Sequence, residues 1–333
     1  MFAQLTPLYI KTRPYKALTR TVSYAFFEGR PLFTKGRWIN PLVFFHLGIE
    51  KKLPIPKKVE QPVFIVGMGR SGTTVLGTVM SMHKDIGFLN EPRALWHSIC
   101  PMEDVNGHFG AGPACYRMDE SHVTDVMKIQ AHRLFGAYLA MVFSNRLAVK
   151  HPTSIFRVPF IKAIFPDARF IFIARSGWGT CRSVVEWCQA FGRTGHHLIY
   201  DWWGINRRKW HLMLEQLVPG DDVLSGIGDR LASIDNVRDM AAVEWVLTMR
   251  EGLRQKARYP DDIHLIRYEE LMANPGKTLL NAGRFCNLPQ DEVFLSFATR
   301  LLKPGAPPRP FAMNGLVQQA FFRTMSELGY QTP

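Results

Sequence analysis

The chain has 333 residues, 47% of them hydrophobic and 21% charged, which is enough apolar sequence for one large domain or for two smaller ones. Its formal net charge of +13 favours anionic partners such as nucleotides, acidic glycans, nucleic acid or anionic lipid. No apolar run is long enough to span a bilayer, and the five cysteines form no C-x-x-C pair. The sequence therefore argues against disulfides and zinc, and it favours a cytoplasmic protein.

Residues 1–60 form a basic segment that is also rich in aromatic residues. They contain eleven Lys or Arg and three Glu, a net charge of +8, and basic residues interrupt any apolar signal sequence. Two interpretations remain open: the segment packs on the core, or it rests on an anionic membrane surface such as the inner face of a cell membrane. Pro54 and Pro56 end the segment like a linker, so we expect the main domain to span residues 61–333.

Short apolar runs alternate with helical patterns after residue 60. The first run, residues 63–66, is typical of a strand buried in a parallel sheet, and a glycine-rich turn and a helix over residues 73–82 follow it. Further strands are predicted at 147–149, 169–174 and 263–266, and further helices at 122–142, 155–165, 177–190 and 235–257. This alternation predicts an α/β fold with a doubly wound, central parallel sheet.

Basic side chains follow three of the predicted strands. Arg70 comes after the first strand, Lys150 after the run at 147–149, and Arg175 after the run at 169–174. In doubly wound sheets, ligands bind outside the carboxyl ends of the strands. The pattern therefore predicts that these three residues share one site for an anion.

The turn after the first strand has the spacing of an ATP-type phosphate loop, from Gly67 to Gly72, but Thr73 stands where that loop requires lysine. Glycines allow backbone N–H groups to approach an anion, and the start of a helix favours negative charge. The turn is therefore predicted to bind an anion other than a nucleoside triphosphate; the alternative is a tight strand-to-helix turn with no ligand. The candidate ligands are Gly69, Arg70, Ser71, Gly72, Thr73 and Thr74.

A second candidate phosphate site lies downstream. Arg175 ends a predicted strand, and Ser183 lies eight residues later in the next helix. Arginine offers a planar pair of N–H donors to a phosphate, and serine offers a hydroxyl donor on a short side chain. The alternative is that Arg175 pairs with a carboxylate in the core. Two separate phosphate sites without the loop lysine suggest a nucleotide that carries phosphates at both ends of its ribose.

These motifs together resemble the sulfotransferases that use 3′-phosphoadenosine 5′-phosphosulfate (PAPS). Residues 64–74 resemble the 5′-phosphosulfate loop of that family, and Arg175 with Ser183 matches its 3′-phosphate motif. Stretches 165–171 and 267–271 are similar to further family landmarks, and the agreement in order covers roughly residues 60–290. The resemblance implies a single domain with a fold close to that of nucleotide kinases. It also implies transfer of a sulfuryl group from PAPS to an acceptor hydroxyl or amine by in-line displacement, with release of PAP and without a required metal.

The resemblance also implies roles for individual residues. Arg70 and Lys150 are the candidates for stabilising charge on the leaving phosphate. Glu91, 21 residues after Arg70, resembles the catalytic glutamate of the tyrosylprotein branch of the family and is the preferred general base. His151 is the alternative base, although it departs by one residue from the Lys-Thr-His pattern of the cytosolic branch. The Arg-Lys-Gly motif of that branch is missing, and residues 303–309 form a basic loop that is a weak substitute.

Two irregular stretches, at about 100–121 and 191–234, are predicted to carry acceptor specificity. The second contains Trp202 and Trp203, which either stack on sugar rings or pack in a lid. We expect the acceptor to be a hydroxyl on a bacterial saccharide, a lipid-linked glycan or a secondary metabolite, and we expect no nucleic-acid partner. The alternatives are a P-loop nucleotide or small-molecule kinase, which needs lysine at position 73 and an aspartate at a strand end, and a non-catalytic adaptor that binds anionic partners.

Overall fold

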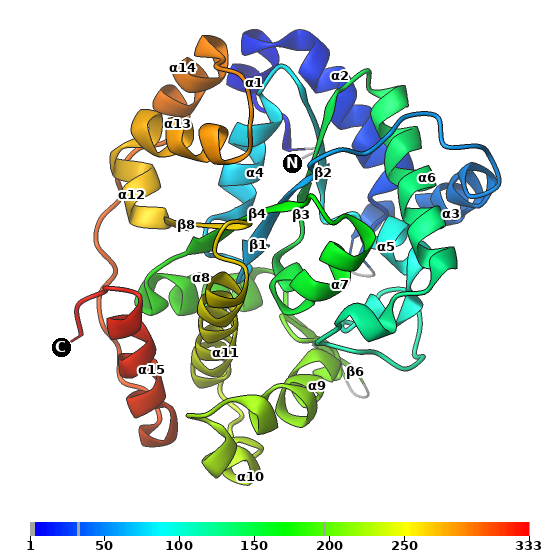
Figure 1. Cartoon of the computed structure of the whole chain (residues 1–333). Coiled ribbons are helices and arrows are strands. Elements are labelled where there is room, and N and C mark those ends of the chain that lie inside the picture. The colour runs from blue at the N-terminus through cyan, green and yellow to red at the C-terminus, as the bar shows by residue number, and fades with distance from the viewer. Residues whose placement is uncertain (1–3, 32–33, 196–197, 333) are drawn as a thin grey trace.

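A parallel β-sheet with the strand order β2-β3-β1-β4-β8 forms the centre of the molecule (Figure 1). The computed structural model describes residues 4–31, 34–195 and 198–332. Within these residues the strands of the sheet are β1 (Val63–Gly67), β2 (Ile86–Asn90), β3 (Arg146–Lys150), β4 (Arg169–Ala174) and β8 (Ile263–Arg267). Every neighbouring pair is parallel, which confirms the predicted α/β fold.

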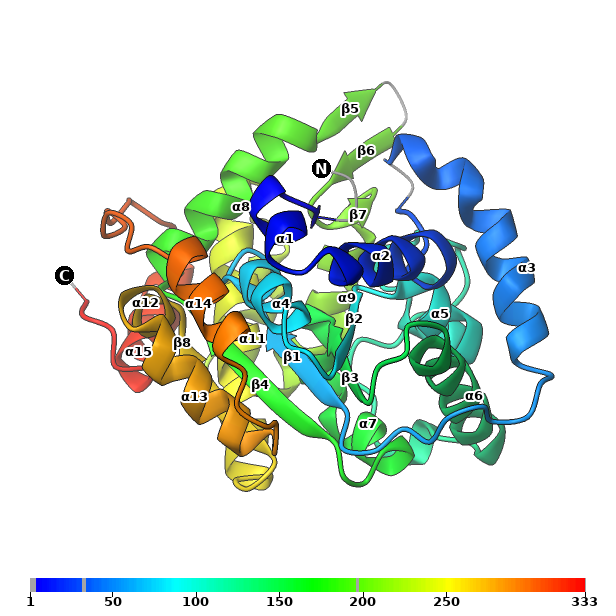
Figure 2. The same ribbon diagram turned by 90° about the horizontal axis from the view of Figure 1, so that it is seen from above.

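Helices cover both faces of this sheet (Figure 2). Side chains alternate along a strand, so Val63 and Ile65 of β1 enter one apolar layer while Phe64 and Val66 enter the other. The first layer is closed by α1 (Pro7–Thr12), α4 (Thr73–Ser81), α12 (Tyr268–Ala273), α13 (Pro275–Phe285) and α14 (Glu292–Leu301). The second is closed by α5 (Arg93–Ile99), α6 (Asp125–Met141), α7 (Val158–Ile164), α8 (Gly177–Phe191), α11 (Val237–Arg258) and α15 (Gly315–Glu327).

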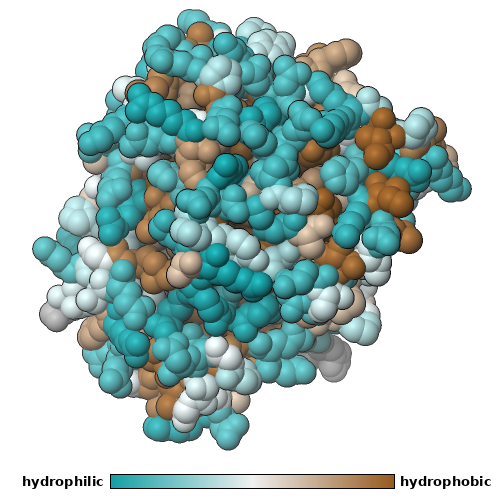
Figure 3. Space-filling view, in the orientation of Figure 1, coloured by the Kyte–Doolittle hydropathy of each residue, from teal (hydrophilic) through white to brown (hydrophobic). Residues whose placement is uncertain are grey.

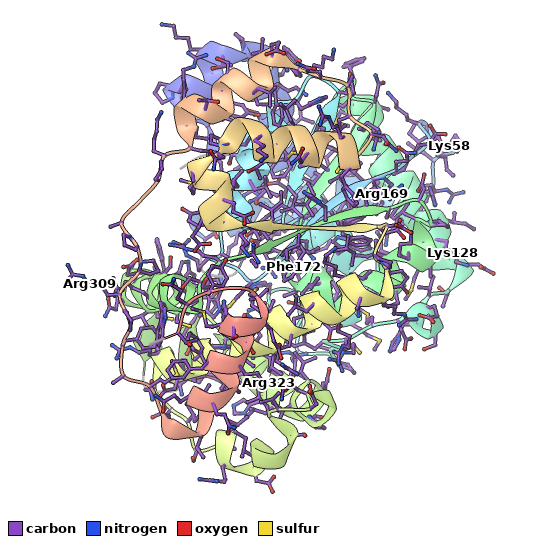
Figure 4. The ribbon with its side chains drawn as sticks, turned by 60° about the vertical axis from the view of Figure 1, so that its left-hand side comes forward. Lys58, Lys128, Arg169, Phe172, Arg309 and Arg323 are labelled. Atoms are coloured by element: carbon purple, nitrogen blue, oxygen red, sulfur yellow. The ribbon has the colours of Figure 1, made fainter. Side chains whose placement is uncertain are left out.

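The central strands are buried on both faces, which explains their continuous apolar sequences. Every residue of β1 is buried, and so are the last five residues of β4. Phe172 of β4 lies between the sheet and α11, where its ring packs directly against Gly252 (Figure 4). This packing fixes the carboxyl edge of the sheet as a rigid base for a site.

The structure corrects the sequence analysis in two places. The sequence pattern predicts no strand between residues 83 and 121, yet β2 lies there; its Gly87, a weak strand former, fits closely against Tyr138 and Ser144. The stretch 191–234 is more regular than predicted, because its short segments pair with one another rather than with the main sheet. It contains the antiparallel strands β5 (Arg193–Gly195), β6 (Leu198–Asp201) and β7 (Gly204–Ile205), and the helices α9 (Arg208–Gln216) and α10 (Gly228–Leu231).

The N-terminal segment packs on the core over much of its length. It contains α1, α2 (Pro14–Val22) and α3 (Asn40–Glu50), and α3 lies at the right-hand edge of Figure 1. Tyr9 and Phe27 are buried, and the buried Lys16 donates hydrogen bonds to two backbone carbonyls beside β2. Arg20 and Glu28 form a buried ion pair with a 2.6 Å N–O distance. Within the described residues, no helix is long and apolar enough to cross a bilayer.

Candidate active site

The carboxyl ends of the strands meet at one cleft. Glu91 follows β2, Lys150 ends β3, and the loop that contains Arg70 follows β1; all three residues line this cleft. Arg175 follows β4, and its guanidinium donates a hydrogen bond to the backbone oxygen of Arg70 across 3.0 Å. Because β3 and β4 flank β1 on either side, the sheet brings together the three basic residues that the sequence places at strand ends.

The loop between β1 and α4 has the backbone of an anion cradle. Gly72 has a φ of 100° and Arg70 a φ of 71°, both in the left-handed region. A side chain at position 72 would also collide with the ring of Tyr268, so only glycine fits there. The loop ends at the N-terminus of α4, where unpaired backbone N–H groups and the helix dipole favour an anion.

The hydroxyl groups of this loop have different surroundings. Ser71 is buried, and its hydroxyl donates to the Met68 carbonyl at 2.6 Å, so it fixes the turn. Thr73 is also buried, but its Oγ1 has no hydrogen-bond partner among the described residues. Thr74 is exposed and lines the cleft. A buried hydroxyl without a partner is costly unless a ligand completes it, so Thr73 fits a ligand-binding role.

Arg70, Arg175 and Ser183 form one cluster. Arg70 Nε donates to Ser183 Oγ at 3.0 Å, while the Arg175 guanidinium lies over the Tyr268 ring, 4.5 Å from its centre. Burial, and then the neighbouring charge of Arg175, lowers the pKa of Arg70. The residues of the two predicted phosphate sites thus lie close together, and Arg70 contacts both Ser183 and Arg175.

Glu91 is held between two cations in the same cleft. Lys150 Nζ donates to Glu91 Oε1, and Arg93 Nη2 donates to Glu91 Oε2 at 2.6 Å. Burial on its own would raise the pKa of Glu91, but the charges of Lys150 and Arg93 outweigh it and hold the pKa well below its usual value. Glu91 also has a left-handed backbone, with a φ of 46°, and strain of this kind is concentrated at functional sites. Arg93 is a site residue that the sequence analysis does not predict, although its place two residues after Glu91 is a usable signal.

His151 follows Lys150 in the chain but does not line this cleft. Its ring is buried and faces a small internal cavity that also contains Glu103 and Arg157. His151 Nδ1 lies 3.0 Å from Ser154 Oγ, and Nε2 lies 3.7 Å from Glu103 Oε2. Burial, and then the charges of Arg93 and Arg157, lower the pKa of His151 well below its usual value. The geometry thus separates the two candidate bases, because Glu91 lines the main cleft and His151 lines the internal cavity.

The other half of the cleft is built by the segment 198–209 and by α11. The Trp202 ring lies over the phosphate-type loop, so close that a Cβ at Gly69 would be 2.6 Å from it. Trp202 Nε1 donates to Glu244 of α11 at 2.8 Å, and the buried Lys209 donates to the other oxygen of Glu244. Trp203, by contrast, is fully buried against Trp210. Of the tryptophan pair, therefore, Trp202 faces the cleft and Trp203 belongs to the core.

The residues of the basic loop at 303–309 do not line the cleft. Arg309 is exposed at the edge of the molecule (Figure 4), and its backbone oxygen accepts a hydrogen bond from Arg182 at 3.2 Å. Neither residue lines the cleft that contains Arg70. The described residues contain no group of three or more His, Cys, Asp or Glu side chains placed to hold a metal ion.

Comparison with known proteins agrees with this geometry. A family model described as the sulfotransferase family matches residues 62–222, which include the loop, Glu91, Lys150 and the Arg175–Ser183 pair. This matched region, just under half of the chain, is similar to the sulfotransferase family. A zebrafish (Danio rerio) protein named protein-tyrosine sulfotransferase 1 is 24% identical over 246 residues, which cover 73% of this chain and 58% of that protein. A human protein of the same name is 25% identical over 37% of this chain and 34% of its own length. The matched part thus covers less than two thirds of each of these relatives.

Solved sulfotransferase structures share the fold. Sulfotransferase STF9 from Mycobacterium avium superposes with a TM-score of 0.50 at 14% identity, covering 97% of this chain and 91% of that one. Sulfotransferase STF1 from Mycobacterium tuberculosis also has a TM-score of 0.50, at 16% identity, covering 95% of this chain and 93% of that one. At such low identity, these similarities establish the fold of the sulfotransferase family for this chain.

Proposed function

We propose that this chain transfers a sulfuryl group from PAPS to an acceptor hydroxyl and releases PAP. The observation that carries the proposal is that Arg70 lines the same cleft as Glu91 and Lys150 and is also hydrogen-bonded to Ser183 and Arg175. An anion cradle with Arg70, Ser183 and Arg175 lies at the carboxyl end of β1, and a carboxylate held by Lys150 and Arg93 lies beside it. The first group suits a phosphorylated donor, and the second suits an acceptor that must lose a proton.

The residues of the cradle fit such a donor. Backbone N–H groups of the loop, Thr74 and the hydroxyl of Thr73, which has no partner among the described residues, would hold the phosphosulfate end. Arg175 and Ser183 would hold the 3′-phosphate, and Arg70 lies between the two ends. When bound, the donor supplies the sulfuryl group that is transferred. Position 73 holds Thr in place of a lysine, which suits a donor without a γ-phosphate.

Glu91 is the residue that we propose as the base for the acceptor hydroxyl. Its carboxylate lines the cleft and is ionised at neutral pH, because Lys150 and Arg93 hold its pKa low. Lys150 has two roles in this proposal: it orients Glu91 before the acceptor enters, and it supplies positive charge where negative charge grows on the leaving phosphate. A carboxylate held by two cations accepts a proton poorly, so Glu91 becomes a better base when Lys150 shares its hydrogen bonds with the donor.

The structure gives little support to the kinase alternative. The residues at the carboxyl ends of the described strands of the main sheet are Gly67, Asn90, Lys150, Ala174 and Arg267, and none is an aspartate that would hold magnesium. The loop also has Thr73 in place of the lysine that contacts the terminal phosphates of ATP. These residues favour a donor whose charge is balanced by arginine and lysine.

The acceptor is proposed to be a hydroxyl on a saccharide, a lipid-linked glycan or another hydroxylated metabolite. Supporting residues come from the two stretches predicted to carry specificity: Asn106 and His108 from the first, and Tyr200, Asp201 and Trp202 from the second, all line the cleft. An aromatic ring between charged and amide groups suits a polar ring compound. Peptide tyrosine is the second candidate acceptor, because the curated relatives are named protein-tyrosine sulfotransferases.

The test is a transfer assay with the full chain and PAPS labelled in the sulfuryl group. The acceptor panel contains hydroxylated glycans and metabolites, amines, and tyrosine peptides, and PAP release is measured in parallel. We expect label on at least one hydroxylated glycan or metabolite, and transfer slower by at least about a hundredfold when Glu91→Gln replaces the wild type. Transfer to amines or to peptide tyrosine alone would overturn the acceptor proposal, and an absence of PAP release with every acceptor would count against the activity itself.

A further inference from the structure

An exposed apolar row follows the outer face of α3 and the residues on either side of it. Trp38, Leu42, Phe45 and Ile49 are 72%, 61%, 69% and 44% exposed, and they are spaced four, three and four residues apart. This spacing places them on one side of the helix. Leu53, 46% exposed, continues the row past the end of α3. In Figure 3, brown hydrophobic side chains gather at the right-hand edge, where Figure 1 places α3.

The opposite face of α3 is fixed to the body of the protein. Val43 and Leu47 are buried in the large core, and Phe44 meets Phe109 edge-on with a 5.2 Å distance between ring centres. Phe109 follows His108, which lines the cleft. The outer apolar row therefore belongs to a helix whose opposite face is fixed in the core, and four large apolar side chains close together on such a helix mark an interaction surface.

The charges around this row are basic. Arg37 precedes Trp38, Lys52 lies between Ile49 and Leu53, and both side chains are exposed. The one acidic residue between positions 34 and 58 is Glu50, which is partly buried, with its carboxylate 4.0 Å from His46. Further along, Lys58 is exposed and pairs with Glu60 at 2.6 Å. An apolar row with basic neighbours and a tryptophan near one end is the pattern of a helix that lies in the interface of an anionic bilayer.

We propose that this α3 face, consisting of Trp38, Leu42, Phe45, Ile49 and Leu53 with Arg37 and Lys52, docks on an anionic lipid surface. The apolar side chains enter the boundary between headgroups and acyl chains, and the two basic side chains contact lipid phosphates. A second copy of the chain is a poorer occupant. In a twofold contact of this face with itself, Arg37 and Lys52 would meet the same basic groups of the other copy, and like charges repel.

The test uses flotation of the full chain with vesicles of phosphatidylcholine alone or mixed with phosphatidylglycerol. The wild type should float with the anionic vesicles and much less with the neutral ones. Leu42→Ser combined with Phe45→Ser should weaken binding to the anionic vesicles by about tenfold or more, because it removes two exposed apolar side chains from the middle of the row. Arg37→Glu combined with Lys52→Glu should remove the preference for anionic lipid. Val293→Ser is the matched control, since Val293 is 41% exposed on α14, at the opposite edge of the molecule from α3 (Figures 1 and 2).

The outcomes separate this proposal from its alternatives. Equal flotation of the wild type and the Leu42→Ser/Phe45→Ser variant would overturn the assignment to the α3 face. An absence of vesicle binding would overturn the lipid proposal, above all if sedimentation showed a dimer that the same variant dissociates, because the face would then be a contact between copies. Binding is measured without donor or acceptor, so the result is independent of whether the proposed transfer activity is correct.

Discussion

Replacing Glu91 by glutamine is the most informative single change in the cleft. The substitution keeps the shape of the side chain and one acceptor oxygen, so it retains one of the two hydrogen bonds donated by Lys150 and Arg93. It removes the carboxylate proposed to accept the acceptor proton. A positioned general base contributes roughly 10²- to 10⁴-fold to rate, or about 3 to 5 kcal/mol of barrier. We therefore expect kcat to fall by at least about a hundredfold. Affinity for PAP should change only a few-fold, because the cradle around Arg70 and Ser183 is untouched.

The assay is PAP release under saturating PAPS with the best acceptor, together with calorimetric binding of PAP. His151→Gln is the matched comparison, since it removes the rival base from the internal cavity and should leave kcat within about threefold when circular dichroism shows a folded protein. A Glu91→Gln enzyme with kcat within threefold of wild type would refute the role of Glu91. A large loss for His151→Gln with a small one for Glu91→Gln would identify His151 as the base.

The pH dependence provides a second check on the same carboxylate. In the free enzyme the pKa of Glu91 lies well below its usual value, so the acid limb of kcat/KM should fall below pH 4.5. Arg93→Gln removes one of the two cations that lower this pKa, and burial then opposes the charge of Lys150 alone. The pKa of Glu91 should rise, and the acid limb should move to higher pH. An acid limb that stays in place in the Arg93→Gln variant would show that Glu91 does not control it.

Three further predictions concern binding and stability. Arg175→Ala should weaken PAP binding by tenfold or more in calorimetry, because it removes a guanidinium from the cluster with Arg70; unchanged affinity would exclude Arg175 from the donor site. Gly72→Ala should lower the melting temperature and abolish PAP binding, since the new Cβ collides with Tyr268 at a φ of 100°, and a stable variant that binds PAP normally would contradict the loop geometry. Asp291 is nearly buried, which raises its pKa, but hydrogen bonds from Arg13 and from two backbone amides outweigh burial and lower the pKa from 3.8 to about 2. Its ionised form should therefore stabilise the folded chain by roughly 2 kcal/mol above about pH 4, and this contribution should be lost as the pH falls toward 2. Asp291→Asn should accordingly lower the free energy of unfolding in urea at pH 7 and have little effect near pH 2.

Local sequence predicts the main sheet well where strands are buried on both faces. β1 and β4 are continuous apolar runs, and the loop after β1 is marked by Gly67 and Gly72, so both strand and turn follow from the sequence. The sequence does not predict β2, because Gly87 interrupts its apolar pattern. The close packing of Tyr138 and Ser144 on Gly87 explains why a glycine stands there. A strand whose residues are chosen by tertiary packing, such as β2, is therefore not predicted from its local sequence.

The candidate site also contains residues that the sequence predicts and contacts that it does not. Arg70, Lys150 and Arg175 are predicted to share a site because they follow strands, and the sheet order β3-β1-β4 brings them together. No local pattern predicts that Trp202 covers Gly69, or that Glu244 of α11 holds the indole of Trp202. These contacts join residues 133 and 42 positions apart in the chain, and the fold alone determines them.

The donor is the central claim, and titration of the full chain with PAP and with ATP tests it most directly. We predict that PAP binds one site per chain and that Arg175→Ala weakens this binding, because Arg70, Arg175 and Ser183 are grouped for a nucleotide with phosphates at both ends of its ribose. ATP should bind much more weakly, since position 73 offers a threonine in place of lysine. Tight binding of ATP without binding of PAP would contradict the account and would favour a kinase.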